Sequence, residues 1–339
     1  MIPSLSPPEY VTWLLTSRCN LRCEHCYASS RPWNDELDEK RVLEIAEEAC
    51  EMGVENLHLT GGEPLLRKDI FKILDAAKGC NTSLFTNLLA MDRKKARRLS
   101  SLGIQVFTSI DGAIKETHEN IRGKDSWKLL MRSIGILREE GVSFTPIFSI
   151  SCLNFKEAGE FVRLADSLGA SSAVLLPVMP FGRAESRDFN ADPHVCVQAI
   201  RLAEETAEEL GFKITLWCIP FAGLLVKSKY VSWDSCKSER IMDIGPSGEV
   251  LICDTLDIPV SILRNKSLKE AWLELNTNSL FVEIMNNNPC PDCSISNVCK
   301  GGCYARSYKK YGSFKNPDPL CPSALKEIHL SSNREIVVV

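Results

Sequence analysis

Short apolar runs alternate with amphipathic segments along the first two thirds of the chain. Runs rich in β-branched and aromatic residues predict strands at 10–16, 56–60, 83–87, 104–110, 143–151 and 172–178. Between these runs apolar residues recur at helical spacing, as in 42–52, and glycines at 53, 141 and 169 mark the ends of three such helices. Strands that alternate with helices predict an α/β fold of six parallel β/α units.

Polar and glycine residues follow each predicted strand. Right-handed crossovers place the carboxyl ends of parallel strands on one edge, which we call the rim. Six such units fit a curved parallel sheet or a partial barrel that holds its ligand at the rim. The residues expected there are Cys19, Gly61, Gly62, Glu63, Asn87, Ser109, Asp111, Asn154 and Gly182.

The helical and strand periodicity weakens from about residue 213, where Gly, Pro and Cys become frequent. We therefore expect a barrel at 1–212 and a small Cys-rich domain at 213–339, loop-rich and organised by metal rather than by a hydrophobic core. The apolar tail EIVVV (335–339) is compatible both with an added edge strand and with packing against the domain.

Charge and apolar content exclude several classes of protein. The 339 residues are 44% hydrophobic with a net charge of −4, so no global basicity favours nucleic acid or an anionic membrane. The basic run 93–98 falls on a predicted helix and indicates a solvated face.

No apolar stretch reaches the ~18 residues of a membrane span. The start MIPSLSPPEYV lacks the regions of a signal peptide, so a cytoplasmic location is expected.

The fifteen cysteines are unevenly distributed. In a reducing compartment clustered cysteines bind metal or perform redox chemistry more often than they form disulfides. One group is Cys19, Cys23 and Cys26, and five cysteines are scattered: Cys50, Cys80, Cys152, Cys196 and Cys218. The remaining group is Cys236, Cys253, Cys290, Cys293, Cys299, Cys303 and Cys321, so two functional regions are expected.

Three thiolates at one strand end favour a soft metal centre. A structural zinc site needs four protein ligands, and His25, between two of the cysteines, is a cramped candidate for the fourth. A [4Fe–4S] cluster held by three cysteines instead leaves one iron open for an exogenous ligand.

Several motifs in order resemble the radical S-adenosylmethionine (SAM) superfamily over roughly residues 8–185. They are CxxxCxxC (19–26), GGEP (61–64), FTN (85–87), SIDG (109–112) and IRG (121–123). Leu88 stands where the family's turn after FTN usually has Gly.

The resemblance implies a role for each motif. Cys19, Cys23 and Cys26 would hold a [4Fe–4S] cluster whose open iron takes SAM. The other positions would contact SAM: His25 at the adenine, Gly61, Gly62 and Glu63 at the methionine, Ser109 and Asp111 at the ribose and carboxylate, and Arg122 at the carboxylate. Asn87 and Asn154, which follow two strands, are further cofactor-binding candidates.

The second cysteine group resembles the SPASM pattern of peptide-modifying radical SAM enzymes across 236–321. That resemblance implies two auxiliary [4Fe–4S] clusters, the first at Cys236, Cys253 and Cys303. The second would be held by Cys290, Cys293, Cys299 and Cys321. A zinc ribbon would need paired CxxC units, and only one is present.

Three residues have open roles: Cys218 and Asp254, near the first auxiliary site, and Arg183, after the sixth predicted strand. Sulfatase maturases supply a fourth thiolate shortly before the position of Cys236, but KSKYVSWDS contains none. Cys218 either closes this cluster or is a buried apolar cysteine, and in the latter case one iron stays open for substrate. Asp254 is either a general base, as proposed for the maturases, or a solvated acid in a turn. Arg183 either binds a carboxylate or closes a turn.

The resemblance implies reductive cleavage of SAM to a 5′-deoxyadenosyl radical, which abstracts hydrogen from a substrate. We expect a peptide or protein maturase; the alternative is a tetrapyrrole side-chain decarboxylase or oxidase. A non-catalytic metal-stabilised binding module is a third possibility, against which the SAM motifs argue. Only 18 residues precede Cys19, so no fused leader-recognition domain is expected. A ferredoxin or flavodoxin is the expected electron donor, with no nucleic-acid or membrane partner.

Overall fold

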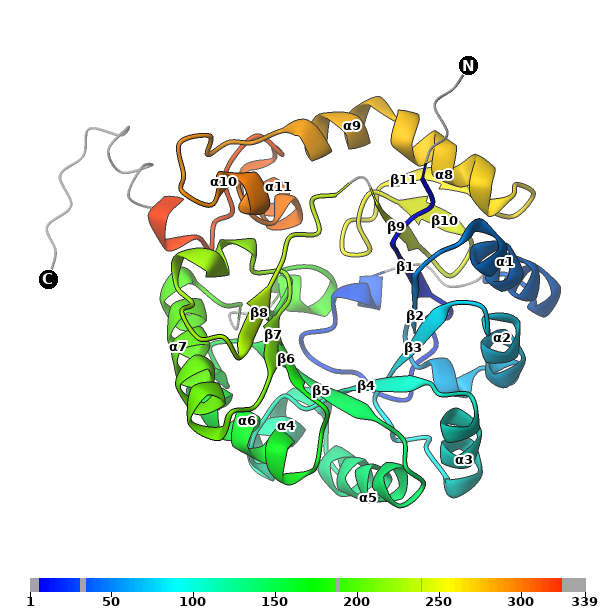
Figure 1. Cartoon of the computed structure of the whole chain (residues 1–339), viewed down its shortest axis with the longest axis horizontal. Helices are drawn as coiled ribbons and strands as arrows, with labels where there is room; N and C mark the ends of the chain where they lie inside the picture. Colours follow the sequence, from blue (N-terminus) through cyan, green and yellow to red (C-terminus); the bar gives the residue numbers. More distant parts are fainter. Residues whose placement is uncertain (1–5, 31–34, 187–189, 239, 325–339) are drawn as a thin grey trace, which may run out of the picture.

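The computed structural model describes residues 6–30, 35–186, 190–238 and 240–324. The apolar tail 335–339 lies outside these residues. One curved sheet organises the described chain, in the order β11-β10-β9-β1-β2-β3-β4-β5-β6-β7-β8. Pairing is parallel from β9 through β1 to β8, and antiparallel among β9, β10 and β11. The sheet does not close on itself (Figure 1), so the predicted α/β partial barrel is confirmed.

The first six strands are the six that the sequence predicts. They are β1 Tyr10–Leu14, β2 Asn56–Thr60, β3 Asn81–Thr86, β4 Gln105–Ser109, β5 Phe144–Ile150 and β6 Ala173–Pro177. The sheet then continues beyond residue 212 through five short strands. These are β7 Ile214–Leu216, β8 Val231–Trp233, β9 Ile241–Ile244, β10 Glu249–Leu251 and β11 Pro259–Ile262.

Among the described residues, helices α1 to α7 surround the sheet (Figure 1), and the end of α4 reaches the cysteine loop, where the Glu24 N–H donates to Ile121 O at 3.0 Å. These helices are α1 Glu39–Met52, α2 Ile70–Ala76, α3 Arg93–Ser101, α4 Lys115–Arg122, α5 Ser126–Glu139, α6 Ala158–Ser167 and α7 Pro193–Leu210. The expected stop of α1 is confirmed, because Gly53 takes φ of 81° and its N–H bonds the carbonyls of Ala49 and Cys50. The basic run lies on α3, where Arg93 and Arg97 are exposed and pair with Glu140.

The two faces of the sheet differ in polarity. Residues that face the helices, such as Val11, Leu57 and Leu84, are fully buried in one core. The alternate residues, such as Thr12 and His58, face the concave side, which we call the lumen. Strand β2 therefore contributes Leu57 and Leu59 to the core and His58 to the lumen.

The segment after residue 213 is more ordered than the sequence predicts. Besides β7 to β11 it forms α8 Leu268–Thr277, α9 Ser279–Asn286, α10 Ser296–Cys299 and α11 Tyr304–Tyr311. Trp272, Leu275 and Phe281 join the main hydrophobic core, so the expectation of a segment without such a core is wrong for α8 and α9. Strands of three or four residues carry too little periodicity to be recognised. The expected loop character holds for the cysteine-bearing stretch around α10.

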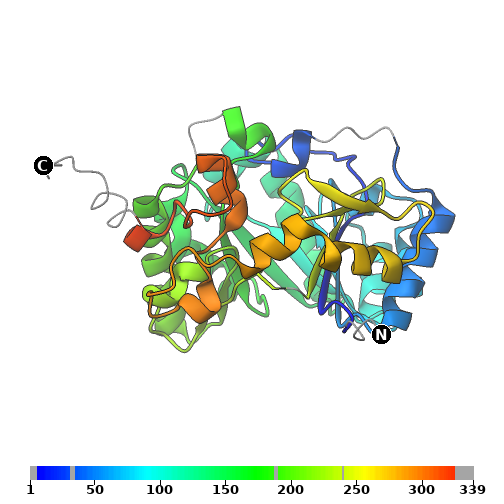
Figure 2. The same ribbon diagram turned by 90° about the horizontal axis from the view of Figure 1, so that it is seen from above.

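Short one-turn 3-10 helices connect several elements: η1 Tyr27–Ser30, η2 Pro64–Leu66, η3 Phe155–Glu157, η4 Gly182–Ser186 and η5 Pro220–Leu224. Figure 2 shows η1 and η4 at the same edge of the barrel, opposite the edge where the chain enters. Among the described residues, no helix combines the length and the apolar character that a membrane crossing requires.

Candidate radical SAM site and auxiliary cysteine sites

The first three cysteines lie in the loop between β1 and η1, at the rim of the barrel (Figure 2). Cys23 is buried, whereas Cys19 is exposed. Burial raises the pKa of the Cys23 thiol to about 11, the Arg122 guanidinium opposes the rise, and charge on Cys26 and Cys19 adds to it. The three thiols therefore lie close enough to repel one another as thiolates, and such a donor set fits a cationic metal cluster.

Gly61 and Gly62 are required by a close approach of two backbones. Gly61 has φ of 139°, and a Cβ there would lie 2.4 Å from the carbonyl oxygen of Thr16. A Cβ on Gly62 would lie 2.4 Å from the carbonyl oxygen of Arg18. The Gly62 N–H instead donates to Thr16 O at 2.6 Å. The glycines thus hold the end of β2 against the chain leading into Cys19, a structural reason besides the methionine contact that the resemblance implies.

Glu63 is buried and braces two strand ends against the cysteine loop. Its Oε1 accepts from the Thr86 hydroxyl at 2.6 Å, and its Oε2 accepts from the Asn87 N–H at 2.7 Å. Asn87 Nδ2 in turn donates to Asn20 Oδ1 at 2.8 Å and lies 3.8 Å from Cys19 Sγ. Leu88 adopts φ of 64°, so this turn keeps the left-handed geometry that glycine would favour.

Asp111, Arg122 and His25 form a charged group beside Cys23. Arg122 Nε donates to Asp111 Oδ2 at 2.5 Å, and Arg122 Nη1 lies 3.8 Å from Cys23 Sγ. Burial alone would raise the pKa of Asp111, but Arg122, His25, the Ser149 N–H and His118 together lower it to about 2. Burial lowers the pKa of His25 to about 4. His25 Nδ1 is buried and, within the described chain, has no hydrogen-bond partner, so it remains available to a bound ligand.

The remaining two cofactor candidates, Asn154 and Ser109, differ in burial. Asn154 is 1% exposed, and its amide bonds only the chain itself. Its Nδ2 donates to Asp111 O at 3.0 Å and to Ser149 O at 2.9 Å, while Oδ1 accepts from Ser151 N at 2.8 Å. Asn154 therefore holds the Asp111 segment in place. Ser109 ends β4 and is half-buried near Asp111.

Arg183 and Gly182, at the end of β6, clamp the cysteine loop. Arg183 Nε donates to Cys23 O at 2.8 Å, and its backbone N–H donates to Cys26 O at 3.1 Å. Gly182 has φ of 60°, and a Cβ there would lie 2.5 Å from the carbonyl oxygens of Cys26 and Tyr27. The structure thus favours the turn-closing role of Arg183, which the sequence left open.

Four cysteines of the C-terminal group line one small cavity: Cys290, Cys293, Cys299 and Cys321. Burial raises the pKa of the Cys299 thiol to about 12, and charge on Cys321 and Cys290 adds to the rise. Four thiols around one cavity form the ligand set of a [4Fe–4S] cluster. These four cysteines are the ones that the resemblance implies for the second auxiliary cluster.

Cys236, Cys253 and Cys303 come together in a second group, in which Cys303 is buried and the other two are half-buried. Burial raises the pKa of the Cys236 and Cys253 thiols well above the usual range. Charge on Cys303 raises both further, and Cys236 also raises the pKa of Cys253. Buried thiols that repel one another as thiolates need a cation to hold them ionised, so this group also fits a metal cluster.

Three charged residues that the sequence analysis did not select lie beside the two cysteine groups. Arg306 and Asp318 form a buried ion pair at 2.5 Å, and Asp318 Oδ2 accepts from the Cys303 N–H at 2.9 Å. Lys237, next to Cys236, donates from Nζ to Lys300 O at 2.9 Å. Burial lowers the pKa of Lys237 to about 8. Apart from their place among cysteines, nothing in the sequence distinguishes these residues from surface charges.

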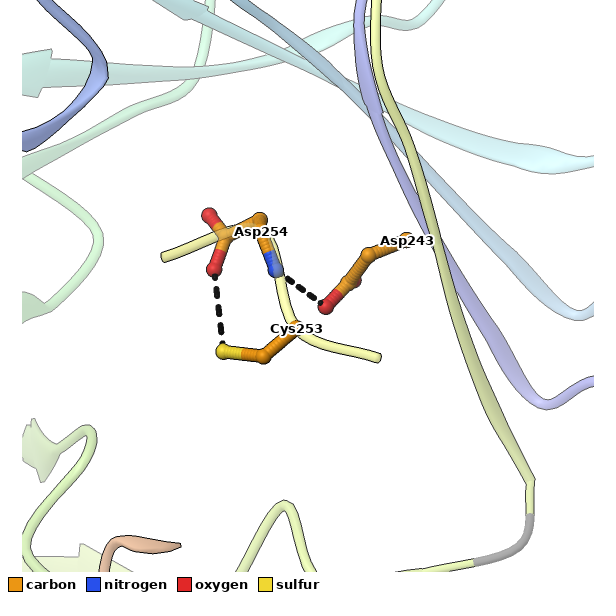
Figure 3. Close-up of side chains that lie close together, drawn as sticks. All are labelled: Asp243, Cys253 and Asp254. Atoms are coloured by element: carbon orange, nitrogen blue, oxygen red, sulfur yellow. Dashed lines mark hydrogen bonds between the residues drawn. The ribbon is translucent and has the colours of Figure 1, made fainter. Parts of the chain in front are cut away.

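Asp254 lies between the C-terminal cysteines and the rim loop. Its Oδ2 accepts from the Tyr27 hydroxyl at 2.6 Å, and Tyr27 directly follows Cys26. Figure 3 shows its carboxylate turned toward Cys253 and its backbone N–H toward Asp243, at 3.7 Å and 2.8 Å respectively. Ligand atoms of these three residues lie within 4.8 Å of one another. Asp254 is therefore half-buried and hydrogen-bonded, rather than a solvated acid in a turn.

Aromatic rings line the lumen below the rim. Phe85 on β3 and Phe107 on β4 stack at 4.6 Å. Trp217, which follows β7, lies 5.3 Å from Phe107 and 6.0 Å from Phe85. Because β7 is not a neighbour of β3 or β4 in the sheet, Trp217 reaches these rings only across the concave side. None of the strands β1 to β8 carries an Asp, Glu, Lys or Arg residue.

The fold and the rim site define a class. Residues 13–165 match the family model of the radical SAM superfamily. The chain therefore carries a radical SAM domain, as the rim motifs predicted.

Relatives at full length include two kinds of radical SAM enzyme. The AdoMet-dependent heme synthase of Methanosarcina barkeri is 26% identical, over 95% of this chain and 98% of the relative. The mycofactocin maturase MftC of Mycobacterium tuberculosis is 27% identical, over 98% of this chain and 87% of the relative. The solved structure of anSMEcpe with bound AdoMet and a Kp18Cys peptide has a TM-score of 0.77 at 18% identity, covering 95% of this chain and 96% of that one.

Proposed function

We propose that this protein is a peptide or protein maturase that cleaves SAM reductively and abstracts hydrogen from a substrate side chain. The radical SAM domain and the maturase relatives support the class of reaction. The ring-lined lumen, whose strands carry no Lys or Arg, supports the class of substrate.

When bound, a [4Fe–4S] cluster and SAM would supply a 5′-deoxyadenosyl radical, the species that attacks an unactivated C–H bond. Cys19, Cys23 and Cys26 would hold the cluster. His25, with its buried Nδ1 lacking a partner, is proposed to bind the adenine. Gly61, Gly62, Glu63 and Asn87 would fix the methionine end by holding the rim backbone, and Ser109, Asp111, Arg122 and Asn154 the ribose and carboxylate end.

Asp254 is proposed as the base that removes a proton from the substrate. The Tyr27 hydroxyl, 2.6 Å from its carboxylate, orients it between the rim loop and Cys253. A proton acceptor beside an auxiliary cluster suits the oxidation of a substrate radical, because loss of an electron makes the neighbouring proton acidic. The auxiliary clusters, at Cys236, Cys253 and Cys303 and at Cys290, Cys293, Cys299 and Cys321, would take that electron.

The side chains that line the lumen are the reason for proposing a peptide substrate. Its walls offer rings, hydroxyls and, on β9 beside Thr12, the Asp243 carboxylate, while β1 to β11 carry no Lys or Arg. A buried carboxylate needs a cationic partner. Of the cations near the rim, Arg122 pairs with Asp111 and Arg183 bonds the Cys23 carbonyl, whereas Arg22 in the cysteine loop is exposed to solvent. An apolar or aromatic peptide side chain needs no such partner.

A tetrapyrrole precursor is the second candidate, and the aromatic wall is the observation that favours it. A planar macrocycle stacks well on rings arranged as Phe85 and Phe107 are. The heme synthase relatives fit this possibility equally well in identity and coverage. The several carboxylates of such a precursor, however, would lack cations in the lumen.

A ferredoxin or flavodoxin is the proposed electron donor, and a reducing, cytoplasmic compartment suits fifteen cysteines without a disulfide among those described. We propose the functional division at residue 212 between the barrel and the cysteine-rich region, although the sheet itself crosses it.

The test is anaerobic incubation of the protein with SAM, dithionite and one substrate class at a time. We expect 5′-deoxyadenosine to rise above the SAM-only background with a pool of short peptides rich in aromatic and β-branched residues, and a peptide product of changed mass. A rise confined to iron-coproporphyrin would replace the peptide assignment with the second candidate. No 5′-deoxyadenosine under any condition would contradict both.

A further inference from the structure

The first auxiliary site has three thiols from the C-terminal group, whereas a closed [4Fe–4S] cluster needs four ligands. No cysteine lies in the segment directly before Cys236. A fourth thiol nevertheless stands at this site. Cys218, two residues beyond the end of β7, is brought to the group by the barrel sheet rather than by the cysteine-rich stretch.

One ion pair fixes the backbones of Cys218 and Cys303 together. Arg306 Nη2 donates to Cys218 O at 2.6 Å and to Asp318 Oδ2 at 2.5 Å. Asp318 Oδ2 also accepts from the Cys303 N–H at 2.9 Å. Arg306 and Asp318 are 2% and 0% exposed, so these bonds lie within the interior and fix the two cysteines rigidly.

Tyr304 connects the same group to Cys253. Its hydroxyl donates to Ile252 O at 3.0 Å, one residue before Cys253, and Tyr304 directly follows Cys303. Tyr304 is 6% exposed, so this bond is buried and holds the backbone before Cys253 beside Cys303.

The contacts of Arg306 and Asp318 place Cys218 beside Cys303, although Cys218 follows a barrel strand and Cys303 lies in the cysteine-rich stretch.

The backbone at Cys218 takes a conformation that cysteine does not favour. Its φ is 55°, in the left-handed region, which costs a non-glycine residue about 1 kcal/mol or more. Such strain is common where a side chain must be held in one direction for function. An apolar cysteine that merely filled the core would gain nothing from this conformation.

We propose that Cys218 is the fourth protein ligand of the first auxiliary cluster, together with Cys236, Cys253 and Cys303. The inference rests on the proposed function, since it presumes an auxiliary cluster at this site. Each thiol loses one proton on binding, and no electron is transferred. With four cysteine ligands the cluster has no iron open to substrate, so its role is confined to accepting electrons. Substrate is then held by the lumen and Asp254 alone.

The test begins with a variant in which Cys19, Cys23 and Cys26 are all replaced by Ala, so that only auxiliary iron remains. We expect about eight iron atoms per chain in this background after anaerobic reconstitution. Adding Cys218→Ala should either halve that iron or leave a three-cysteine cluster whose reduced electron paramagnetic resonance (EPR) signal shifts on addition of cyanide. The parent background should show no cyanide shift.

Cys196→Ala is the matched control. Cys196 is 0% exposed, and the charges that shift its pKa are those of Arg306, Asp318 and Asp192, none of them a thiol. It should keep all auxiliary iron and remain insensitive to cyanide. Cys218→Ser supplies a ligand of nearly the same size if the Ala variant fails to fold, and it should shift the EPR signal of one cluster.

Two outcomes would overturn the proposal in different ways. Unchanged iron and an unchanged, cyanide-insensitive signal in both Cys218 variants would exclude Cys218 as a ligand while leaving the auxiliary clusters in place. A triple-Ala background that binds no iron would instead remove the auxiliary clusters themselves, and with them that part of the proposed function.

Discussion

The two cysteine regions differ in how they hold their thiols. At the rim, three cysteines occupy one short loop, Cys19 is exposed, and the loop is clamped by backbone contacts from β2 and β6. In the C-terminal group no cysteine is exposed, and Cys303 of the first auxiliary site is buried beside a buried ion pair and a buried tyrosine. The rim keeps one side accessible for an exchanging ligand, whereas the C-terminal sites enclose theirs. This difference suits a cluster that binds SAM and clusters that carry electrons.

The largest expected effect comes from removing one rim thiol. Replacing Cys19, Cys23 or Cys26 with Ala should abolish 5′-deoxyadenosine formation, because no other described thiol lies in that loop. Auxiliary iron should be retained, which distinguishes a local loss from misfolding. Cys152→Ala, at an exposed cysteine, serves as control and should leave cleavage intact. Cleavage that survives in any of the three rim variants would remove the functional difference between the two regions.

The next effect is on the C-terminal side alone. Asp318→Asn leaves the buried Arg306 charge without its partner, which typically costs about 3–5 kcal/mol. We expect auxiliary iron to fall while the rim cluster still cleaves SAM. Glu283→Gln, which breaks an exposed pair with Lys315, should change stability by about 1 kcal/mol or less. Thermal unfolding and iron content measure both, and equal effects of the two variants would contradict the buried, structural role of Asp318.

A smaller effect is expected where the two regions meet. Asp254→Asn should lower formation of the modified substrate about 100-fold, while SAM cleavage continues, since a positioned base contributes about that factor. Product mass spectrometry beside 5′-deoxyadenosine quantification separates the two steps. Asp257→Asn, at an exposed acid three residues further on, is the control. If both variants form product at the wild-type rate, Asp254 is not the base.

The smallest effect concerns acid stability, which we expect to originate in the barrel, because the described residues after 213 contain no histidine. Burial lowers the pKa of His58 from 6.5 to about 4. Between these values the unfolded chain binds a proton that the folded chain does not, so stability falls as pH falls from 6.5 toward 4. Between pH 7.5 and pH 5 wild type should lose about 2 kcal/mol more than His58→Phe. Denaturant titrations at the two pH values measure this, and equal losses would contradict burial of neutral His58.

The sequence predicted those features that depend on local pattern. The strand at 56–60 coincides with β2, and every predicted rim residue lies at or after a strand end. The reason for Gly61 and Gly62 could not be predicted, because the backbone they approach, at Thr16 and Arg18, is more than forty residues away in sequence. The strands β7 to β11 were missed because each is three or four residues long and is stabilised by long-range pairing, as β9 is by β1. The Arg306–Asp318 pair could not be predicted from the sequence either, because only burial distinguishes it from surface charges.

The contrast between an exchangeable rim site and enclosed C-terminal sites is tested most directly by EPR of the reduced wild-type protein with and without SAM. We expect signals from three clusters, of which only one changes when SAM is added. That signal should be absent from the variant lacking Cys19, Cys23 and Cys26. A change in an auxiliary signal on addition of SAM, or a protein that contains zinc and no sulfide, would contradict the division of labour between the two cysteine regions.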